Sequence, residues 1–123
     1  IVASMVEREV SNKNDKPQVA QVFLKRLKDG MNLGSDVTAF YGAVVAGQTP
    51  TVVYDSPYNT RIHGGLPVGP ISNVGESSLE AVAYPASTDW VYFVAGDDGK
   101  TYFSKTNEEH EALTEQHCKK LCQ

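Results

Sequence analysis

One carboxylic acid in this sequence lies where helical spacing calls for an apolar side chain. Residues 1–10 have the periodicity of a helix, and Val2, Met5 and Val6 mark its apolar face. Counting three residues on from Val6, or four from Met5, reaches Glu9. Burial among apolar groups disfavours the ionised form of a carboxyl group and raises its pKa. The pattern therefore favours Glu9 as a general acid.

Two other roles for Glu9 fit the same pattern. The residue could end its helix near the surface, or it could form a structural ion pair with an arginine such as Arg26. Glu7, two positions earlier, is predicted to point to the opposite, solvated side, beside Ser4 and Arg8. Periodicity alone proposes Glu9 as the acid and leaves these alternatives open.

A second group of candidate residues lies in segment 55–75, which contains four glycines and three prolines. A loop of this length is unusual in a compact domain unless it has a function. Rigid prolines and permissive glycines would hold Tyr58 and Asn59 in fixed positions. An aromatic face beside an amide suits the C–H face and the N-acetyl group of a sugar. Tyr58 could equally belong to the core, and Asp36, a further candidate, could simply cap a helix.

The elements that must position these residues are helical in the first part of the chain. Residues 1–10 form the first predicted helix, and a second spans about 17–29, with a proline in its first turn. Ser35 or Asp36 is expected to cap a short third helix that ends at Gly42. The five residues after Gly42 are its continuation or a loop.

The middle of the chain has weaker local signals. The β-branched run 51–54 suggests a short strand. Ser77 and Glu80 have the spacing of a capping box and predict a fourth helix, which Pro85 ends.

The C-terminal part of the chain predicts a hairpin and a last helix. Residues 90–95 are the strongest strand signal, and a Gly-rich turn leads to 101–103, so the two segments should pair antiparallel. Thr106 and Glu109 form a second capping box, which opens a helix to about Leu121. The predicted class is α+β: a compact domain with several helices, a β-hairpin and a long Gly/Pro-rich loop.

The composition is that of an ordinary globular domain. The chain has 123 residues, of which 41% are hydrophobic, and a net charge of −4. We therefore interpret residues 1–123 as one domain and expect no nucleic-acid partner. No apolar run reaches the roughly 18 residues of a membrane span. No phosphate-binding loop or dinucleotide motif occurs, so we expect no cofactor.

The cysteines and histidines do not form a recognisable metal site. Cys118 and Cys122 lie one helical turn apart near His117, which allows metal or redox chemistry, but metal sites normally have three or four ligands. We interpret the two cysteines as exposed or lightly packed thiols on a frayed C-terminal helix. The three histidines do not form a His-x-x-x-His pair, which disfavours catalytic zinc.

Several motifs follow one another in an order that matches a known family. They are Ala-Ser-Met-Val-Glu-Arg-Glu at 3–9, Val-Phe-Leu-Lys-Arg-Leu at 22–27, Gly-Met-Asn-Leu-Gly-Ser-Asp-Val-Thr at 30–38, Ser-Pro-Tyr-Asn-Thr at 56–60, Gly-Leu-Pro-Val-Gly-Pro-Ile at 65–71, and Tyr-Phe-Val with Phe-Ser at 92–94 and 103–104. These motifs resemble those of the YceG-like family of endolytic murein transglycosylases. The resemblance covers residues 1 to about 115.

The resemblance implies a fold and an activity. It implies a lysozyme-like domain of a lytic transglycosylase that cuts the β-1,4 bond between N-acetylmuramic acid and N-acetylglucosamine inside peptidoglycan strands. The family's catalytic glutamate, the last acid of the first motif, falls on Glu9. It implies a substrate-binding role for Asp36, Thr38, Tyr58, Asn59 and Thr60.

The chain departs from the family motifs at a few positions, and these bear on substrate contacts more than on the acid. They are Lys25, Gly34, Val37, Val68 and Arg61, where the family commonly has Asn, Gln, Pro, Pro and an aromatic residue.

The resemblance also implies where the protein works and with what. Family members have an N-terminal membrane helix with the catalytic part outside the cytoplasmic membrane, so we expect this chain to be the C-terminal part of such a protein. The expected partners are glycan strands and cell-wall synthesis proteins. Two alternatives remain: a non-catalytic peptidoglycan-binding module, and a hydrolytic muramidase with Asp36 or Asp55 as its second carboxylate.

Overall fold

The computed structural model describes residues 1–120, which form helices and one hairpin. The elements are α1 (Val2–Glu9), α2 (Lys16–Lys28), α3 (Asp36–Val45), α4 (Glu76–Ala83), β1 (Tyr92–Ala95), β2 (Thr101–Ser104) and α5 (Asn107–His117). The predicted α+β class, the first two helices and the antiparallel hairpin are confirmed.

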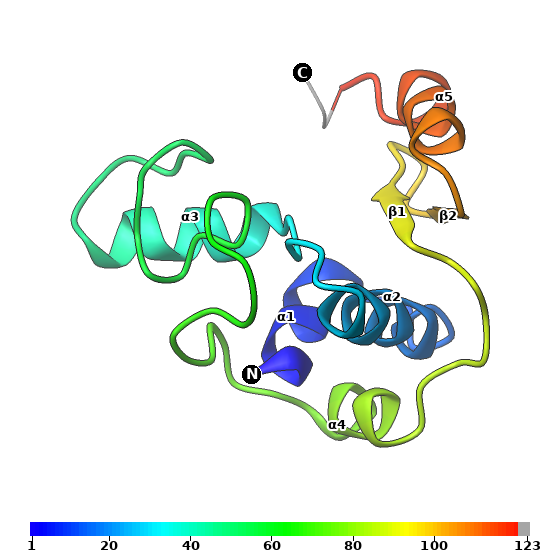
Figure 1. The fold of residues 1–123 in the computed structure, drawn as a ribbon, viewed down its shortest axis with the longest axis horizontal. Coiled ribbons are helices and arrows are strands. Elements are labelled where there is room, and N and C mark those ends of the chain that lie inside the picture. The colour runs from blue at the N-terminus through cyan, green and yellow to red at the C-terminus, as the bar shows by residue number, and fades with distance from the viewer. Residues whose placement is uncertain (121–123) are drawn as a thin grey trace.

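Helices α1, α2 and α4 pack together and form the base of the molecule (Figure 1). Their apolar faces meet in a core that includes Met5, Val6, Val19, Ala20 and Phe23. Full burial of a large apolar side chain stabilises the fold by about 1.5–3 kcal/mol. This packing fixes the position of α1 and therefore of Glu9, its last residue.

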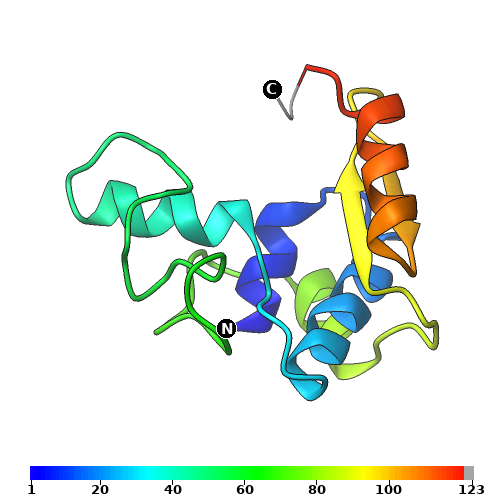
Figure 2. The same ribbon diagram turned by 45° about the horizontal axis from the view of Figure 1, so that its top comes forward.

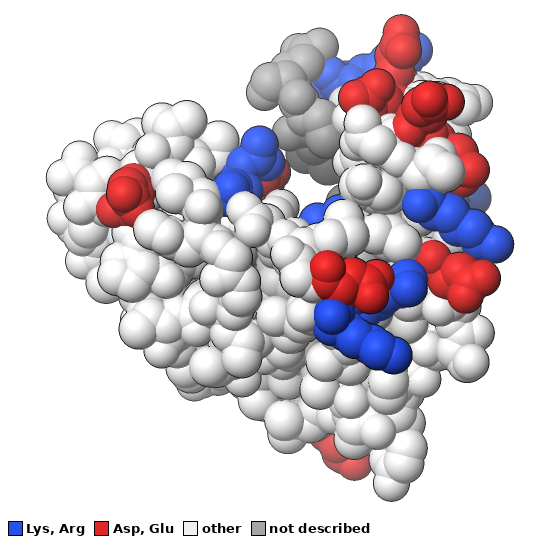
Figure 3. Space-filling view, viewed as in Figure 1, with Lys and Arg blue, Asp and Glu red and all other residues white. Residues whose placement is uncertain are grey.

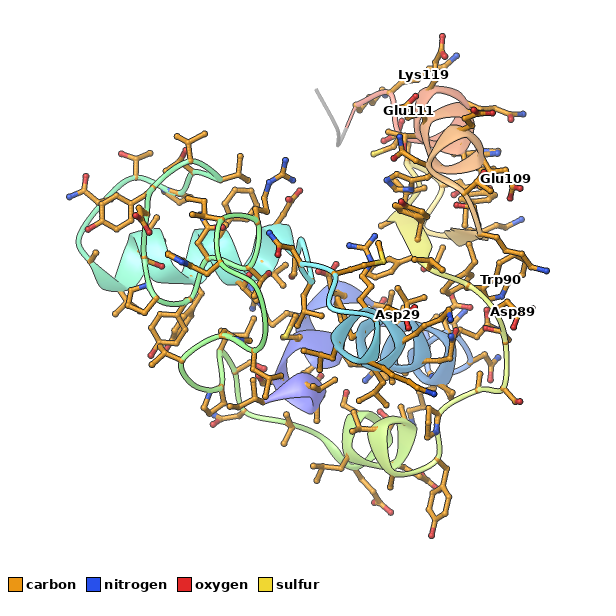
Figure 4. The ribbon with its side chains drawn as sticks, in the orientation of Figure 1. Asp29, Asp89, Trp90, Glu109, Glu111 and Lys119 are labelled. Atoms are coloured by element: carbon orange, nitrogen blue, oxygen red, sulfur yellow. The ribbon has the colours of Figure 1, made fainter. Side chains whose placement is uncertain are left out.

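Two further parts rise from this base, as Figures 1 and 2 show. Helix α3 and segment 46–75 form one of them, and the hairpin with α5 forms the other. In the hairpin Phe93 pairs with Phe103, and the Phe93 ring meets Phe23 of α2 edge-on at 5.5 Å. Gln21 of α2 also donates a hydrogen bond to the carbonyl of Trp90, on the segment that leads to β1 (Figure 4). These contacts fasten the hairpin to the base.

Helix α3 runs through Gly42 to Val45, so Gly42 does not end it, and of the two alternatives for the residues after Gly42 the continuation of the helix is the one observed. A Cβ atom at position 42 would lie 1.8 Å from the Ser56 hydroxyl oxygen and 3.1 Å from Cβ of Tyr58. The glycine therefore lets segment 46–75 approach α3 closely and does not terminate the helix. Ser35 is the N-cap residue, and Asp36 is the first residue of the helix.

Residues 51–54 do not form the strand that their β-branched side chains predicted. The carbonyls of Val52 and Tyr54 accept hydrogen bonds from the Asn59 side-chain amide, at 3.1 and 2.8 Å. A side chain takes the place that a partner strand would have, so the segment stays irregular.

Helix α4 begins without the predicted capping box of Ser77 and Glu80. Its N-cap residue is Gly75, and Ser77 lies inside the first turn. A carboxylate from α1 replaces the box: one oxygen of Glu7 accepts hydrogen bonds from the backbone N–H of Gly75 and the hydroxyl of Ser78, both at 2.9 Å. These bonds lower the pKa of Glu7, with the bond from Gly75 the largest cause.

The predicted solvated side of α1 is therefore only partly solvated. Arg8 is exposed, but Ser4 is fully buried and Glu7 is about one-third exposed. The Ser4 hydroxyl donates to the carbonyl of Ile1 at 2.6 Å and accepts from the backbone N–H of Ile71 at 3.0 Å. Helix α1 is consequently bonded to later parts of the chain through Ser4, at Ile71, and through Glu7, at the start of α4.

Helix α5 begins as predicted at Thr106, whose hydroxyl accepts a hydrogen bond from the N–H of Glu109 at 3.1 Å. The reciprocal half of the capping box is displaced by one residue, because the Glu109 carboxylate accepts from the N–H of Lys105.

The expected extension of α5 to Leu121 is wrong, since the helix ends at His117. The chain leaves the helix because the Asp97 carboxylate in the hairpin turn accepts the N–H groups of Lys119 and Lys120, at 2.8 and 3.0 Å. Leu121 itself lies outside the described residues. Within residues 1–120, no helix combines the length and the apolar character that crossing a bilayer requires.

Candidate active site

A cleft of about 420 Å³ lies between the two parts that rise from the helical base. Figure 3 shows the hollow between the part built on α3 and the part built on the hairpin and α5. Polar residues from every side line it: Glu9, Arg26, Ser35, Asp36, Arg61 and His110. Only Glu9 and Asp36 of these were candidates in the sequence.

Glu9 enters the cleft from the C-terminal end of α1 and is partly buried. Its pKa rises from 4.5 to about 7, because desolvation disfavours the charged form and the nearby Asp36 carboxylate adds repulsion. One hydrogen bond opposes this: the Ser35 hydroxyl donates to Glu9 Oε1 at 2.7 Å and favours the ionised form. At neutral pH the group is thus poised between its acid and its base form.

The alternative of a structural ion pair between Glu9 and Arg26 does not occur within residues 1–120. The Arg26 guanidinium donates instead to the backbone carbonyls of Val91, Asn32 and Leu33. Glu9 does end its helix, as the other alternative expected, but it faces a cleft there.

Ser35 is held in place by two buried threonines. Its backbone N–H donates to the Thr60 hydroxyl at 2.9 Å, and its carbonyl accepts from the Thr38 hydroxyl at 2.7 Å. The two threonine hydroxyls lie 2.7 Å apart. Thr38 and Thr60 were expected to bind substrate, but their hydroxyls are bonded inside the protein and do not reach the cleft.

Asn59 is also buried, with both polar atoms of its side chain in use. Its amide nitrogen donates to two carbonyls of segment 51–54, and its oxygen accepts from the backbone N–H of Arg61 at 2.9 Å. The Tyr58 ring packs edge-on against Tyr41 at 4.8 Å, the core position that was the alternative for it. Neither residue lines the cleft, so this arrangement does not offer the sugar contact expected of Tyr58 and Asn59.

Asp36 does line the cleft, at its exposed rim. Its carboxylate forms an ion pair of 2.6 Å with Arg61, and both side chains are about half exposed. In the sequence, Arg61 stood out only as a departure from a family motif. Nothing in its spacing from Asp36 predicted the ion pair between them.

Arg26 and His110 also line the cleft; sequence reasoning named Arg26 only as a possible ion-pair partner of Glu9 and did not place His110 at the site. The Arg26 guanidinium lies 4.9 Å over the Tyr92 ring, and His110 stacks on Tyr92 at 5.1 Å. Burial and the charge of Arg26 lower the pKa of His110. Cys118 also lines the cleft, but it is 4% exposed and disulfide-bonded, so the expectation of an exposed or lightly packed thiol is wrong for this residue. Cys122 lies outside the described residues.

Residues 1–120 contain no group of three or more His, Cys, Asp and Glu side chains that could hold a metal ion. The arrangement suits acid–base chemistry by Glu9, because the second carboxyl group of the cleft, Asp36, is paired with Arg61.

Replacing Glu9 by glutamine is expected to stabilise the fold at alkaline pH. Because the folded protein raises the pKa of this group from 4.5 to about 7, Glu9 favours the folded state least once the pH exceeds about 7. One pKa unit corresponds to about 1.4 kcal/mol. Allowing for the partial exposure of the residue, Glu9→Gln should raise the free energy of unfolding by about 2 kcal/mol at pH 8.

Urea denaturation at pH 4 and at pH 8 measures this effect. At pH 4 the carboxyl is mostly protonated in both states, so the two proteins should differ little. If the difference in free energy of unfolding between Glu9→Gln and the unchanged chain is the same at pH 4 and at pH 8, burial does not disfavour the charged form of Glu9, and its placement here is contradicted.

Comparison with known proteins gives consistent similarities. A model of the YceG-like family matches residues 1–116. Two proteins named endolytic murein transglycosylase are similar to the chain: that of Bacillus subtilis (strain 168) is 41% identical over 121 residues, and that of Streptococcus pneumoniae serotype 2 is 30% identical over 125 residues. Both alignments cover 94% of this chain, but only 33% and 23% of those proteins.

A crystal structure of a yceG-like protein from Listeria monocytogenes has the same fold. It superposes with a TM-score of 0.82 at 43% sequence identity, over 91% of this chain and 38% of that one. The chain therefore spans about a quarter to two-fifths of the length of these relatives.

Proposed function

The chain belongs to the YceG-like family, and from this membership we propose that it is the catalytic domain of an endolytic lytic transglycosylase of peptidoglycan. The observation that carries the proposal is Glu9, a partly buried carboxyl group that lines the cleft and has a pKa of about 7. The proposed bond is the β-1,4 linkage between N-acetylmuramic acid and N-acetylglucosamine. Because peptidoglycan lies outside the cytoplasmic membrane, the proposal also assigns the domain to that side.

The proposed reaction needs one carboxyl group in two states. Glu9 starts protonated and donates its proton to the glycosidic oxygen, so that the bond from C1 of the muramic acid to that oxygen breaks. The resulting carboxylate then takes the proton of the C6 hydroxyl of the same sugar, whose oxygen bonds to C1. Glu9 is protonated again, no water is consumed, and the new end is a 1,6-anhydro ring.

A pKa near neutrality suits this sequence of steps. A carboxyl group of ordinary pKa would be ionised at pH 7 and could not act first as an acid. The burial of Glu9 and the charge of Asp36 supply the required increase in pKa. Arg26 and His110 line the same cleft as Glu9, and N–H groups are the donors that the carbonyl and hydroxyl groups of a glycan can accept from.

The products of digestion test the proposal. Purified glycan strands incubated with the protein should yield fragments with 1,6-anhydro ends, which mass spectrometry identifies as lighter by one water than reducing ends. Fragments with reducing ends would instead show hydrolysis and contradict the transglycosylase assignment. Strands that bind, as measured by calorimetry, but are not cleaved would support the non-catalytic binding module.

A hydrolytic muramidase is the second candidate function, and one observation favours it. Asp36 lines the same cleft and acts on Glu9 through its charge, so a second carboxylate is present. Inverting and retaining glycosidases both need such a partner. The Arg61 ion pair at 2.6 Å engages Asp36, however, and this is why the single-carboxyl reaction is preferred.

A further inference from the structure

Ser35 is the N-cap residue of α3, yet its side chain does not cap the helix. An N-cap serine ordinarily accepts a hydrogen bond from an N–H of the first turn, which stabilises the helix by about 1 kcal/mol. Here the hydroxyl turns away and donates to Glu9 Oε1 at 2.7 Å. A side chain that leaves its local role for a distant carboxyl group points to a role at that group.

The backbone of Ser35 is fixed more firmly than a loop residue requires. Its N–H is bonded to Thr60 and its carbonyl to Thr38, the two threonines are bonded to each other, and the N–H of Gly34 donates to the carbonyl of Thr60 at 3.0 Å. Ser35, Thr38 and Thr60 are 3% exposed or less. The hydroxyl of Ser35 is thus aimed at Glu9 by bonds from α3 and from segment 46–75 together.

The two oxygens of Glu9 have different surroundings as a result. Oε1 is held by Ser35, whereas Oε2 has no hydrogen bond to any residue among 1–120. Building on the proposed function, we propose that Ser35 is a positioning residue that reserves Oε2 of Glu9 for proton transfer to and from the glycan. Thr38 and Thr60 are then supports of Ser35, in place of the substrate contacts expected for them.

The same hydrogen bond acts on both steps of the reaction. It stabilises the carboxylate that forms when Glu9 gives up its proton, and so it opposes the effects of burial and of Asp36 on the pKa of Glu9. The other charged or titratable groups that line the cleft are Arg61, which is paired with Asp36, and Arg26 and His110. Among residues 1–120, none of these groups shares a hydrogen bond with the Ser35 hydroxyl.

Ser35→Ala tests the role of the hydroxyl, with Ser35→Thr as the conservative variant and Ser87→Ala, at an exposed position, as the control. Because a hydrogen bond to a charged group is lost, kcat should fall about 10- to 100-fold, with KM changed little. The alkaline limb of the pH–rate profile should move to higher pH, since the pKa of Glu9 rises. Ser35→Thr should restore both quantities, and Ser87→Ala should change neither.

The titration of Glu9 gives a readout that does not depend on turnover. The carboxyl carbon of Glu9, followed by NMR in the protein labelled with ¹³C at glutamate, should titrate at higher pH in Ser35→Ala. Thr60→Val, which keeps the side-chain volume but removes the acceptor for the Ser35 N–H, should shift the titration in the same direction. An unchanged kcat and an unchanged titration in Ser35→Ala overturn the inference, whereas a shifted titration in a protein without turnover overturns the proposed function alone.

Discussion

Glu9→Gln is expected to lower the rate of glycan-strand cleavage by about 10²- to 10⁴-fold or more, the usual contribution of a general acid. Glutamine has nearly the same shape and can still accept the Ser35 hydrogen bond, but it has no proton to donate and cannot take one from the C6 hydroxyl. The loss should appear in kcat. Product formation, followed by chromatography of the released anhydro fragments, measures it.

Glu80→Gln is the matched control, since Glu80 is an exposed glutamate on α4, away from the cleft. This variant should keep the activity of the unchanged chain. The unchanged chain should also lose activity as the pH rises through about 7, because Glu9 then loses the proton that the first step needs. Activity in Glu9→Gln within tenfold of the control would remove Glu9 from the mechanism.

Gly42→Ala is expected to destabilise the fold by about 3 kcal/mol, at the upper end of the range for overpacking. In an ordinary helix interior this substitution stabilises, because alanine is about 1 kcal/mol more favourable than glycine. Here the added Cβ would lie 1.8 Å from the Ser56 hydroxyl oxygen and 2.9 Å from Ser56 Cβ, so α3 and segment 46–75 must separate. The midpoint of urea denaturation measures the change.

A double variant separates the steric effect from helix propensity. Ser56→Gly removes both atoms nearest to the new Cβ, so Gly42→Ala should cost much less in that background. Equal destabilisation in the two backgrounds, or a gain in stability for Gly42→Ala alone, would show that the close approach of Ser56 is not what requires glycine.

The parts of the fold that were predictable from the sequence are those that local physical chemistry decides. Helix α2 carries its own signals, a first-turn proline and apolar residues at helical spacing. The hairpin follows from two β-rich runs around a Gly-rich turn, and Thr106 caps α5 with its own side chain. The position of Glu9 on the apolar face of α1 belongs here too, because it depends on periodicity alone.

The predictions that failed depend on side chains from distant parts of the chain. The N-terminus of α4 is bonded by Glu7, a residue of α1. The strand expected at 51–54 is replaced by bonds to Asn59. Such long-range partners leave no periodic signal, and a capping motif such as that at Ser77 matches the rule without being used.

The candidate site divides in the same way. Glu9 and Asp36 were found because a motif and a helix start point to them, and both line the cleft. Arg26 was named only as a possible ion-pair partner of Glu9, and His110 was not found, since only the tertiary fold brings α2 and α5 to the same cleft. Asn59 was expected to bind the sugar. An amide in a Gly/Pro-rich loop can form hydrogen bonds either with a sugar or with the loop backbone, and the residue type does not distinguish the two.

Helix α1 carries two acids with different contacts: Glu7 accepts a hydrogen bond from the first backbone N–H of the α4 N-terminus, and Glu9 lines the cleft. Successive helical positions differ by about 100° in direction. Inserting or deleting a single residue between the core contacts of α1 and these acids would therefore turn Glu7 away from α4 and Glu9 away from the cleft. One short helix thus carries both a contact that holds the fold together and the proposed acid. We therefore expect insertions and deletions to be tolerated only outside α1.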